Sequence, residues 1–198
     1  MTLVLLDTNA YLRLAKRIQP MLGMKFGQKE YVLTILKDVE NEVLKSPRLK
    51  FHYPWFQDPS IATERLAKRI RLSADEKAEL DAAMSVLHGW VLSHVQAYIS
   101  PHRSPPSPVD CRILAFAQIR PTIVVTDDLG MHQLATDFEF GDSVWHGHEL
   151  LKKMLSAKVI DANVVREIYD ALETNDDLPR TWREVRHTAF RKIFGPPP

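Results

Sequence analysis

The stretch that most constrains the fold is the apolar run at residues 3–6, Leu-Val-Leu-Leu, which ends on the carboxylate of Asp7. A short run that is apolar at every position is typical of a strand buried on both faces, as in a parallel sheet. A helix-like segment follows at 10–16, and we expect Asn9 to cap it. Asp7 is therefore predicted at the carboxyl end of a central strand, the edge where open α/β sheets bind their ligands.

Composition narrows the class of protein. The 198 residues suffice for one well-buried domain with an elaboration. The formal net charge is +1, so any binding of nucleic acid has to come from local basic patches. One cysteine, Cys111, leaves no intrachain disulfide or Cys-rich zinc site and fits a reducing cytoplasm. No run reaches about 18 apolar residues, so we expect a cytoplasmic protein without a membrane segment.

The remaining pattern alternates strands with helices, which predicts an α/β fold with a parallel sheet. Further strands are expected at 31–36, 122–126 and 143–145. Helices are expected at 39–44 (capped by Asp38), 61–72, 74–99, 111–119 and 129–135, from 147 onward, and as two segments within 161–194. Residues 31–44 can alternatively be read as one long helix. The segments 18–29 and 48–60 contain prolines or glycines and are expected to be irregular.

Acidic side chains recur at the expected ends of these elements. Asp7 and the pair Asp127 and Asp128 follow strands, while Glu42 and Asp110 lie on or at the start of helices. If they converge, they form a cluster of hard oxygen ligands, which suits Mg²⁺ or Mn²⁺ rather than zinc. Such a site can activate water for attack on a phosphodiester.

Each acid also has a purely structural interpretation. Asp110 can complete a capping box, Asp127 or Asp128 can cap the next helix, and Glu42 can be a solvated helix residue. A carboxylate that directly follows a buried strand has fewer such roles, so Asp7 anchors the hypothesis. The order and context of the acids support the metal-site hypothesis more strongly than any single acid does.

Four segments of the chain together resemble the acidic motifs of PIN-domain nucleases, a family that includes the VapC-type toxins of toxin–antitoxin pairs. The segments are 5–9, 39–44, 108–113 and 124–128. The resemblance implies a three-layer α/β/α fold with a central parallel sheet over residues 1–156. It leaves a helical insertion at about 46–106 and a helical C-terminal extension at 157–198 packed on the same domain, both longer than the family's usual pattern.

The resemblance also implies an activity and a set of site residues. It implies an endoribonuclease that uses Mg²⁺ or Mn²⁺, with an RNA substrate and with an antitoxin or a second copy as possible partners. The matching metal-binding and catalytic acids are Asp7, Glu42, Asp110 and Asp128. Asn9 and Thr126 match supporting polar residues, and Asp127 and Glu40 are alternatives to Asp128 and Glu42.

A nucleic-acid contact is expected near the start of the insertion. Arg65, Lys68 and Arg69 cluster on one expected helix, and Arg48 lies upstream among aromatic residues. Basic groups interleaved with rings suit a single strand, through phosphate contacts and base stacking. The alternative is an ordinary solvated helix face.

Two other classes of function compete with a nuclease. The first is a PIN-like module that binds RNA or protein without cutting. The second is a phosphatase of the haloacid-dehalogenase kind, whose first strand also ends on Asp, but that family has a second acid where this chain has Asn9. No glycine-rich turn follows Asp7, which disfavours a dinucleotide-binding domain.

Overall fold

The computed structural model describes residues 1–101 and 103–197, and within them five strands form one sheet in the order β2-β3-β1-β4-β5. The strands are β1 (Thr2–Leu6), β2 (Lys25–Phe26), β3 (Tyr31–Thr34), β4 (Thr122–Val125) and β5 (Val144–Trp145). β1 runs parallel to β3 and β4, β4 runs parallel to β5, and β2 is antiparallel to β3. The expected α/β class with a mostly parallel central sheet is confirmed.

The first strand occupies the centre of this sheet, as its apolar run predicts. Val4, Leu5 and Leu6 are completely buried between β3 and β4. The backbone N–H of Asp7 donates to the carbonyl of Val125 at 3.0 Å, so the pairing with β4 extends one residue beyond the strand. The position of Asp7 is therefore fixed by the sheet itself.

The helices of the first half are α1 (Thr8–Leu14), α2 (Lys37–Lys45), α3 (Pro47–His52), the 3₁₀ turn η1 (Pro54–Gln57), α4 (Pro59–Lys68), α5 (Ala74–Ser93) and α6 (Val95–Tyr98). Those of the second half are α7 (Pro108–Ile119), α8 (Leu129–Asp137), the 3₁₀ turn η2 (Gly141–Ser143), α9 (Gly147–Ser156), α10 (Ala162–Thr174), α11 (Arg180–Val185) and α12 (Arg191–Phe194).

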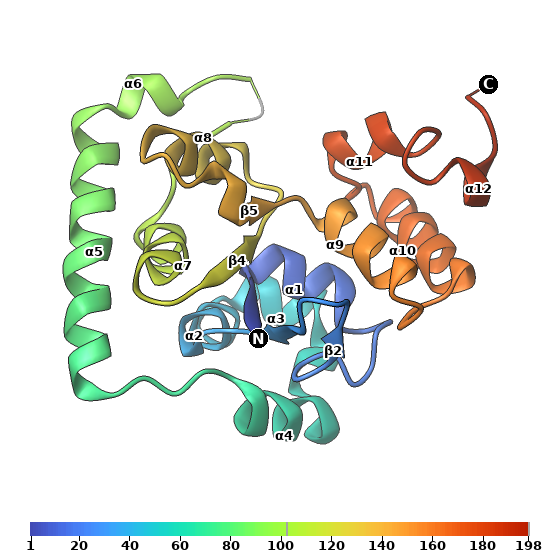
Figure 1. Ribbon diagram of the computed structural model, residues 1–198, viewed down its shortest axis with the longest axis horizontal. Coiled ribbons are helices and arrows are strands. Elements are labelled where there is room, and N and C mark those ends of the chain that lie inside the picture. Colours follow the sequence, from blue (N-terminus) through green and yellow to red (C-terminus); the bar gives the residue numbers. More distant parts are fainter. Residues whose placement is uncertain (102, 198) are drawn as a thin grey trace.

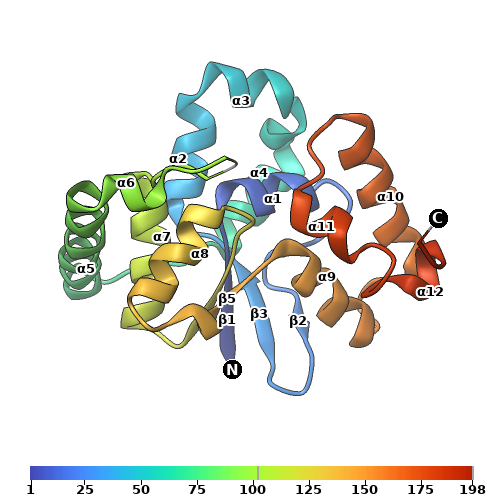
Figure 2. The same cartoon turned by 90° about the horizontal axis from the view of Figure 1, so that it is seen from above.

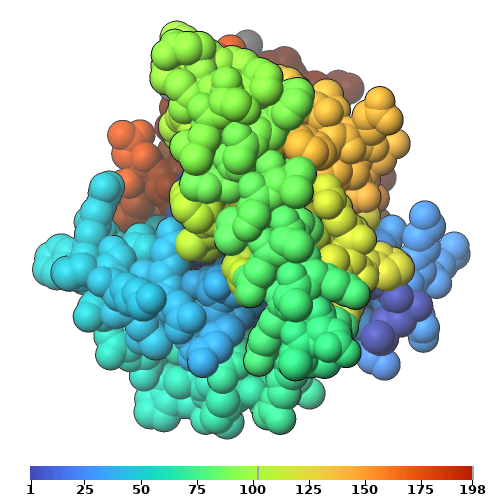
Figure 3. Space-filling model, turned by 90° about the vertical axis from the view of Figure 1, so that its left-hand side faces the viewer, coloured from blue at the N-terminus to red at the C-terminus, as the bar shows by residue number. Residues whose placement is uncertain are grey.

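Helices cover both faces of the sheet. α7 packs against β4 on one side with α5 outside it, and α9 and α10 lie on the other side (Figures 1 and 2). α5 buries Leu80, Leu87 and Val91 and crosses the surface as a ridge (Figure 3). This layering is compatible with a three-layer α/β/α arrangement.

Several expected boundaries differ from the structure. Segment 31–44 is a strand followed by a helix, so the single long helix is wrong. Residues 48–60 contain α3 and η1 rather than irregular chain, and 18–29 contributes β2. The helix expected at 74–99 is divided at His94 into α5 and α6, and the tail forms three helices instead of two. These elements are short and depend on packing, which local pattern does not encode.

The expected caps are partly confirmed. Ser73 with Glu76 and Ser107 with Asp110 both form capping boxes, with Pro108 in the first turn of α7. Asp38 does not cap α2, because the helix begins one residue earlier at Lys37.

The tail packs onto the sheet domain through apolar side chains. Val165, Ile168 and Tyr169 of α10 and Trp182 of α11 are completely buried and belong to the same core cluster as the central strand. Within the described residues, no helix is both long and apolar enough to cross a membrane.

Candidate functional site

Asp7 lies at the junction between β1 and α1 and is almost completely buried, with 3% of its surface exposed. Its Oδ1 accepts from the backbone N–H of Ala10 at 2.5 Å, which makes Asp7 the N-cap of α1. Its Oδ2 accepts from the hydroxyl of Thr126 at 2.5 Å. Burial is the main cause that raises the pKa of Asp7 to about 7, against the opposing effect of these two hydrogen bonds.

Thr126 connects Asp7 to Asp128. While its hydroxyl donates to Asp7, the same oxygen accepts from the backbone N–H of Asp128 at 3.1 Å. Asp128 caps α8, because its Oδ1 accepts from the backbone N–H groups of Gly130 and Met131 at 2.7 and 3.0 Å. Its Oδ2 accepts no hydrogen bond from the described residues, so one carboxylate oxygen is left for another partner.

Glu42 reaches the same neighbourhood from α2. The hydroxyl of Thr8, the residue after Asp7, donates to Glu42 Oε2 at 2.5 Å. Thr8 is buried and Glu42 is half-buried. The contact therefore holds the α2 carboxylate beside the first turn of α1.

Asp110 approaches from the start of α7. Its Oδ2 accepts from the backbone N–H of Ser107 at 2.8 Å, and its own backbone N–H donates to the Ser107 hydroxyl at 3.2 Å. Burial raises the pKa of Asp110, and the negative charges of Asp128 and Glu42 raise it further. The structure thus brings these three acids within electrostatic range of one another.

The two alternative acids, Asp127 and Glu40, have different partners from Asp128 and Glu42. Asp127 is paired with Arg13 at 3.3 Å and also accepts from the indole N–H of Trp182 and the backbone N–H of Gly147, at 2.8 and 3.1 Å. Although burial alone would raise its pKa, hydrogen bonding to His146 and the charge of Arg13 bring the pKa of Asp127 below its usual value. The carboxylate of Asp127 is therefore already engaged in these contacts, and Asp128 is the better candidate for a metal ligand.

The carboxylate of Glu40 is likewise engaged in ion pairs. Its carboxylate pairs with Arg65 at 3.6 Å and forms a second ion pair with Arg69. Glu42, in contrast, accepts only the hydroxyl of Thr8 among the described residues. Glu42 is therefore the better candidate on α2.

The candidate acids share a lack of cationic partners. Within residues 1–101 and 103–197, no Lys, Arg or His forms an ion pair with Asp7, Glu42, Asp110 or Asp128. Neighbouring acids such as Asp38, Asp81 and Asp177 all have an arginine partner. A concentration of unpaired, partly buried carboxylates is costly unless a cation joins them.

The chemistry of this donor set fits a hard divalent cation, because every donor is a carboxylate oxygen. At the same time, the described part of the chain holds no group of three or more His, Cys, Asp or Glu side chains placed to bind a metal ion. Thr126 links Asp7 to Asp128 and Thr8 holds Glu42, whereas Asp110 is bonded to Ser107, so the side chains would have to move toward a shared ion.

The supporting residues differ in part from expectation. Thr126 is completely buried and holds Asp7, whereas Asn9 is exposed and is not the cap of α1. The expected cap at Asn9 is wrong because Asp7 itself accepts from Ala10, which places Asn9 within the helix. The supporting hydroxyl next to Asp7 belongs to Thr8, which sequence reasoning missed and which only the contact with Glu42 reveals.

The expected nucleic-acid patch needs a correction at Arg65. Its side chain is 2% exposed, donates to the carbonyl of Phe56 at 2.7 Å and lies 3.6 Å from the centre of the Phe56 ring. Arg65 is a core residue and does not reach a ligand at the surface. Arg69 is engaged with Glu40, while Lys68 is exposed.

A polar cleft is lined by residues that are close in sequence to Asp7 and Glu42. It has a volume of about 980 Å³ and is lined by residues of α1, α3 and the end of α10. We call it the α1–α3–α10 cleft, and its main polar and aromatic lining residues are Asn9, Lys16, Arg17, Arg48, Tyr53 and Trp55.

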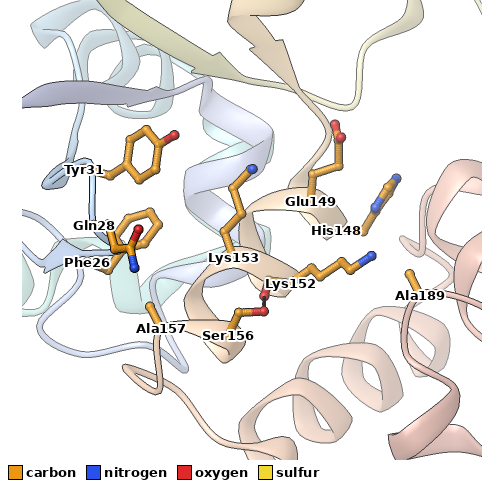
Figure 4. Close-up of a pocket in the computed structure, with 11 residues that line it drawn as sticks. Phe26, Gln28, Tyr31, His148, Glu149, Lys152, Lys153, Ser156, Ala157 and Ala189 are labelled. Carbon is orange, nitrogen blue, oxygen red and sulfur yellow. Dashed lines mark hydrogen bonds between the residues drawn. The ribbon is translucent and has the colours of Figure 1, made fainter.

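A second hollow of about 630 Å³ lies on the α9 side of the sheet. In Figure 4, Phe26 and Tyr31 form one wall, and Lys152 and Lys153 extend from α9 across from them. None of the four candidate acids, all of which lie in the described chain, lines this hollow. The four acids do not line the α1–α3–α10 cleft either, but its lining includes Asn9 and Ser46, which are close in sequence to Asp7 and Glu42.

Three histidines stack beside Asp127. The rings of His132 and His146 are centred 3.9 Å apart, and those of His146 and His148 are 5.3 Å apart. His132 also approaches the carbonyl of Thr126 at 3.0 Å. Their spacing in sequence gave no indication of this column, which forms only because α8 and α9 meet.

Comparisons of the chain with protein-family models, with curated proteins and with solved structures find no match in any of the three.

Proposed function

We propose that the protein is a divalent-metal-dependent endoribonuclease that uses the carboxylate cluster at the carboxyl edge of its sheet. The observation that carries the proposal is the absence of an ion-pair partner, among the described residues, for Asp7, Glu42, Asp110 and Asp128 where nearby acids are paired. Carboxylates gathered from two strand ends and two helices form a site that becomes electrostatically favourable when a cation binds.

The chain's own residues would have distinct roles in this site. Asp7, Glu42, Asp110 and Asp128 would hold Mg²⁺ or Mn²⁺ through their oxygens. When bound, such an ion activates water for attack on a phosphodiester and stabilises the leaving oxygen.

The two hydroxyls position the carboxylates. Thr126 orients Asp7, and Thr8 orients Glu42, by donating to one oxygen of each. The remaining oxygens of Glu42, Asp110 and Asp128 accept no hydrogen bond from the described chain and stay available for the ion.

The resemblance to PIN-domain nucleases supports the same reaction. It further supports a role as the toxin of a toxin–antitoxin pair, with a separate antitoxin protein and a homodimer as partners. The arrangement of β1 with Asp7, and of β4 with Asp128, at adjacent parallel strands is consistent with that family.

The test is RNA cleavage by the purified protein with Mn²⁺, Mg²⁺ or EDTA, beside the variant Asp7→Asn. We expect cleavage that requires metal and is lost in Asp7→Asn. The matched control is Asp75→Asn, an exposed acid in the first turn of α5, which should cut as the unmodified protein does. Full activity in Asp7→Asn would contradict the proposal.

A second candidate is a PIN-like module that binds RNA without cutting it. Two observations favour it: no three ligands are already placed for a metal in the described chain, and the carboxylates of Asp110 and Asp128 are used at helix starts, in the capping box of α7 and as the cap of α8. RNA binding that persists in EDTA, with no cleavage under any divalent metal, would establish this function instead.

A further inference from the structure

We propose that the α1–α3–α10 cleft binds an unpaired nucleic-acid strand. The inference rests on the proposed function for its choice of RNA. Its physical basis is the charge, the aromatic lining and the position of the cleft.

The cleft carries an excess of unneutralised positive charge. Lys16, Arg17 and Arg48 line it, and none of them forms an ion pair with another described residue. The two acids in its wall are already paired, Asp177 with Arg13 at 2.8 Å and Asp176 with Arg183 at 3.5 Å. The cleft therefore presents three cations, two from the turn after α1 and one from α3, to a polyanion, although the whole chain is almost neutral.

Two aromatic rings lie among these cations. Tyr53 and Trp55 line the cleft, are half-buried and pack edge to face with ring centres 6.2 Å apart. Trp55 is held from behind by Tyr11 at 6.5 Å and by Phe56 at 6.3 Å. A ring that is fixed in this way and partly accessible is a platform on which a base can stack.

The combination favours an unpaired strand over a duplex. Bases inside a double helix are already stacked on one another and cannot reach an aromatic side chain, whereas those of a single strand can. Phosphate contacts alone would serve either form. The rings therefore give the cleft its selectivity and the cations give it much of its affinity.

Two residues that line the cleft lie close in sequence to candidate acids. Asn9, on its α1 wall, lies two residues after Asp7. Ser46, on its α2–α3 wall, donates its backbone N–H to the carbonyl of Glu42 at 3.1 Å. The cleft is thus lined by residues of the same elements that carry Asp7 and Glu42, although neither carboxylate lines it.

The C-terminal extension forms the opposite wall. Ala171, Leu172 and Asn175 of α10 and its C-cap line the cleft across from α3. This gives the C-terminal extension a role in holding the nucleic-acid strand, in addition to covering the β-sheet.

The experiment measures binding of a fluorescent single-stranded RNA and of a duplex of the same sequence, in EDTA so that no cleavage occurs. We expect the single strand to bind more tightly than the duplex. Trp55→Leu should weaken single-strand binding roughly fivefold to a hundredfold, the range found for loss of one base–aromatic stack. Arg48→Glu should weaken both forms and lower the salt dependence of binding by about one unit of the log–log slope for each lost phosphate contact.

Lys77→Glu on α5 is the matched charge control, since Lys77 is exposed and lies outside the cleft. Arg48 is exposed too, so Arg48→Glu should fold normally and keep the test valid even where Trp55→Leu does not fold. Equal binding of duplex and single strand, or unchanged affinity in Arg48→Glu, would overturn the inference. Tight single-strand binding without metal-dependent cleavage would support the inference and would count against the proposed nuclease alone.

Discussion

The indole N–H of Trp182 donates to Oδ1 of Asp127 at 2.8 Å, which joins the last third of the chain to the edge of the sheet. Both side chains are buried. Gly147 completes the contact, because a Cβ at this position would lie 2.5 Å from Cζ2 of Trp182. The acid that follows β4 is thereby used to attach the C-terminal extension.

Trp182→Phe should destabilise the protein by about 1–3 kcal/mol, since it leaves a buried carboxylate oxygen with one donor fewer. Chemical denaturation of both proteins measures the difference in the free energy of unfolding. Trp90→Phe serves as control, because Trp90 is 40% exposed and its replacement should change stability little. An unchanged midpoint for Trp182→Phe would show that this bond does not secure the extension.

Although Asp127 and Asp128 are adjacent, Asp127→Asn should mainly reduce stability, whereas Asp128→Asn should mainly reduce cleavage. Asp127→Asn breaks a buried ion pair with Arg13 and should cost about 3–5 kcal/mol of stability. Asp128→Asn keeps a good N-cap for α8 and should cost less than about 0.5 kcal/mol, yet it should abolish metal-dependent cleavage. Unfolding and cleavage assays on the pair decide the assignment, and the reverse outcome would make Asp127 the functional acid.

The stability of the folded protein should depend on the ionisation of Asp7. Burial disfavours the charge and raises the pKa of Asp7 in the folded state to about 7, well above the usual value for an aspartate. The folded state therefore binds the proton more tightly, so this group stabilises the fold most at low pH. Its contribution falls as the pH rises from about 4 to about 7.

The check compares melting temperatures of the unmodified protein and Asp7→Asn between pH 5 and pH 8, without metal. Asn can still accept from Ala10 and carries no charge, so the variant should gain in relative stability as the pH rises. A difference between the two proteins that does not change with pH would contradict the shifted pKa.

Arg65→Ala should impair folding and leave nucleic-acid affinity unchanged. The guanidinium is packed on Phe56 and paired with Glu40, so its removal leaves a half-buried carboxylate with one cation fewer. We expect a loss of about 3–5 kcal/mol. Lys68→Ala, an exposed neighbour on α4, is the control for stability. Weaker RNA binding by a fully folded Arg65→Ala would restore the surface role that burial excludes.

Sequence pattern predicted where most of the candidate acids lie on the strands and helices, because these positions are fixed locally. Asp7 follows a buried apolar strand and Asp128 follows another. Asp110 completes a capping box that Ser107 and Pro108 predict. Each of these placements depends on a few adjacent residues, so local pattern is sufficient to find them.

What sequence did not reveal depends on contacts between distant segments. Arg65 is buried through Glu40 and Phe56, and β2 exists only because two residues pair with β3. The partners of Asp127 lie on α1 and α11 and differ from those of Asp128 beside it. A tertiary contact of this kind leaves no periodicity or cap in the sequence, so sequence alone could not show that the two adjacent acids have different partners.

Glu42→Gln and Glu40→Gln should separate metal binding from structure on α2. In the unmodified protein, Mn²⁺ at about 100 times its dissociation constant should raise the free energy of unfolding by about 2.7 kcal/mol, because it binds only the folded state. Glu42→Gln can still accept from Thr8 and should fold, but it should lose most of this increment. Glu40→Gln removes the charge that pairs Arg65 and Arg69, so it should be less stable while it keeps the full increment from Mn²⁺. Thermal unfolding with and without Mn²⁺ measures both effects in one series, and an equal increment in all three proteins would remove Glu42 from the metal site.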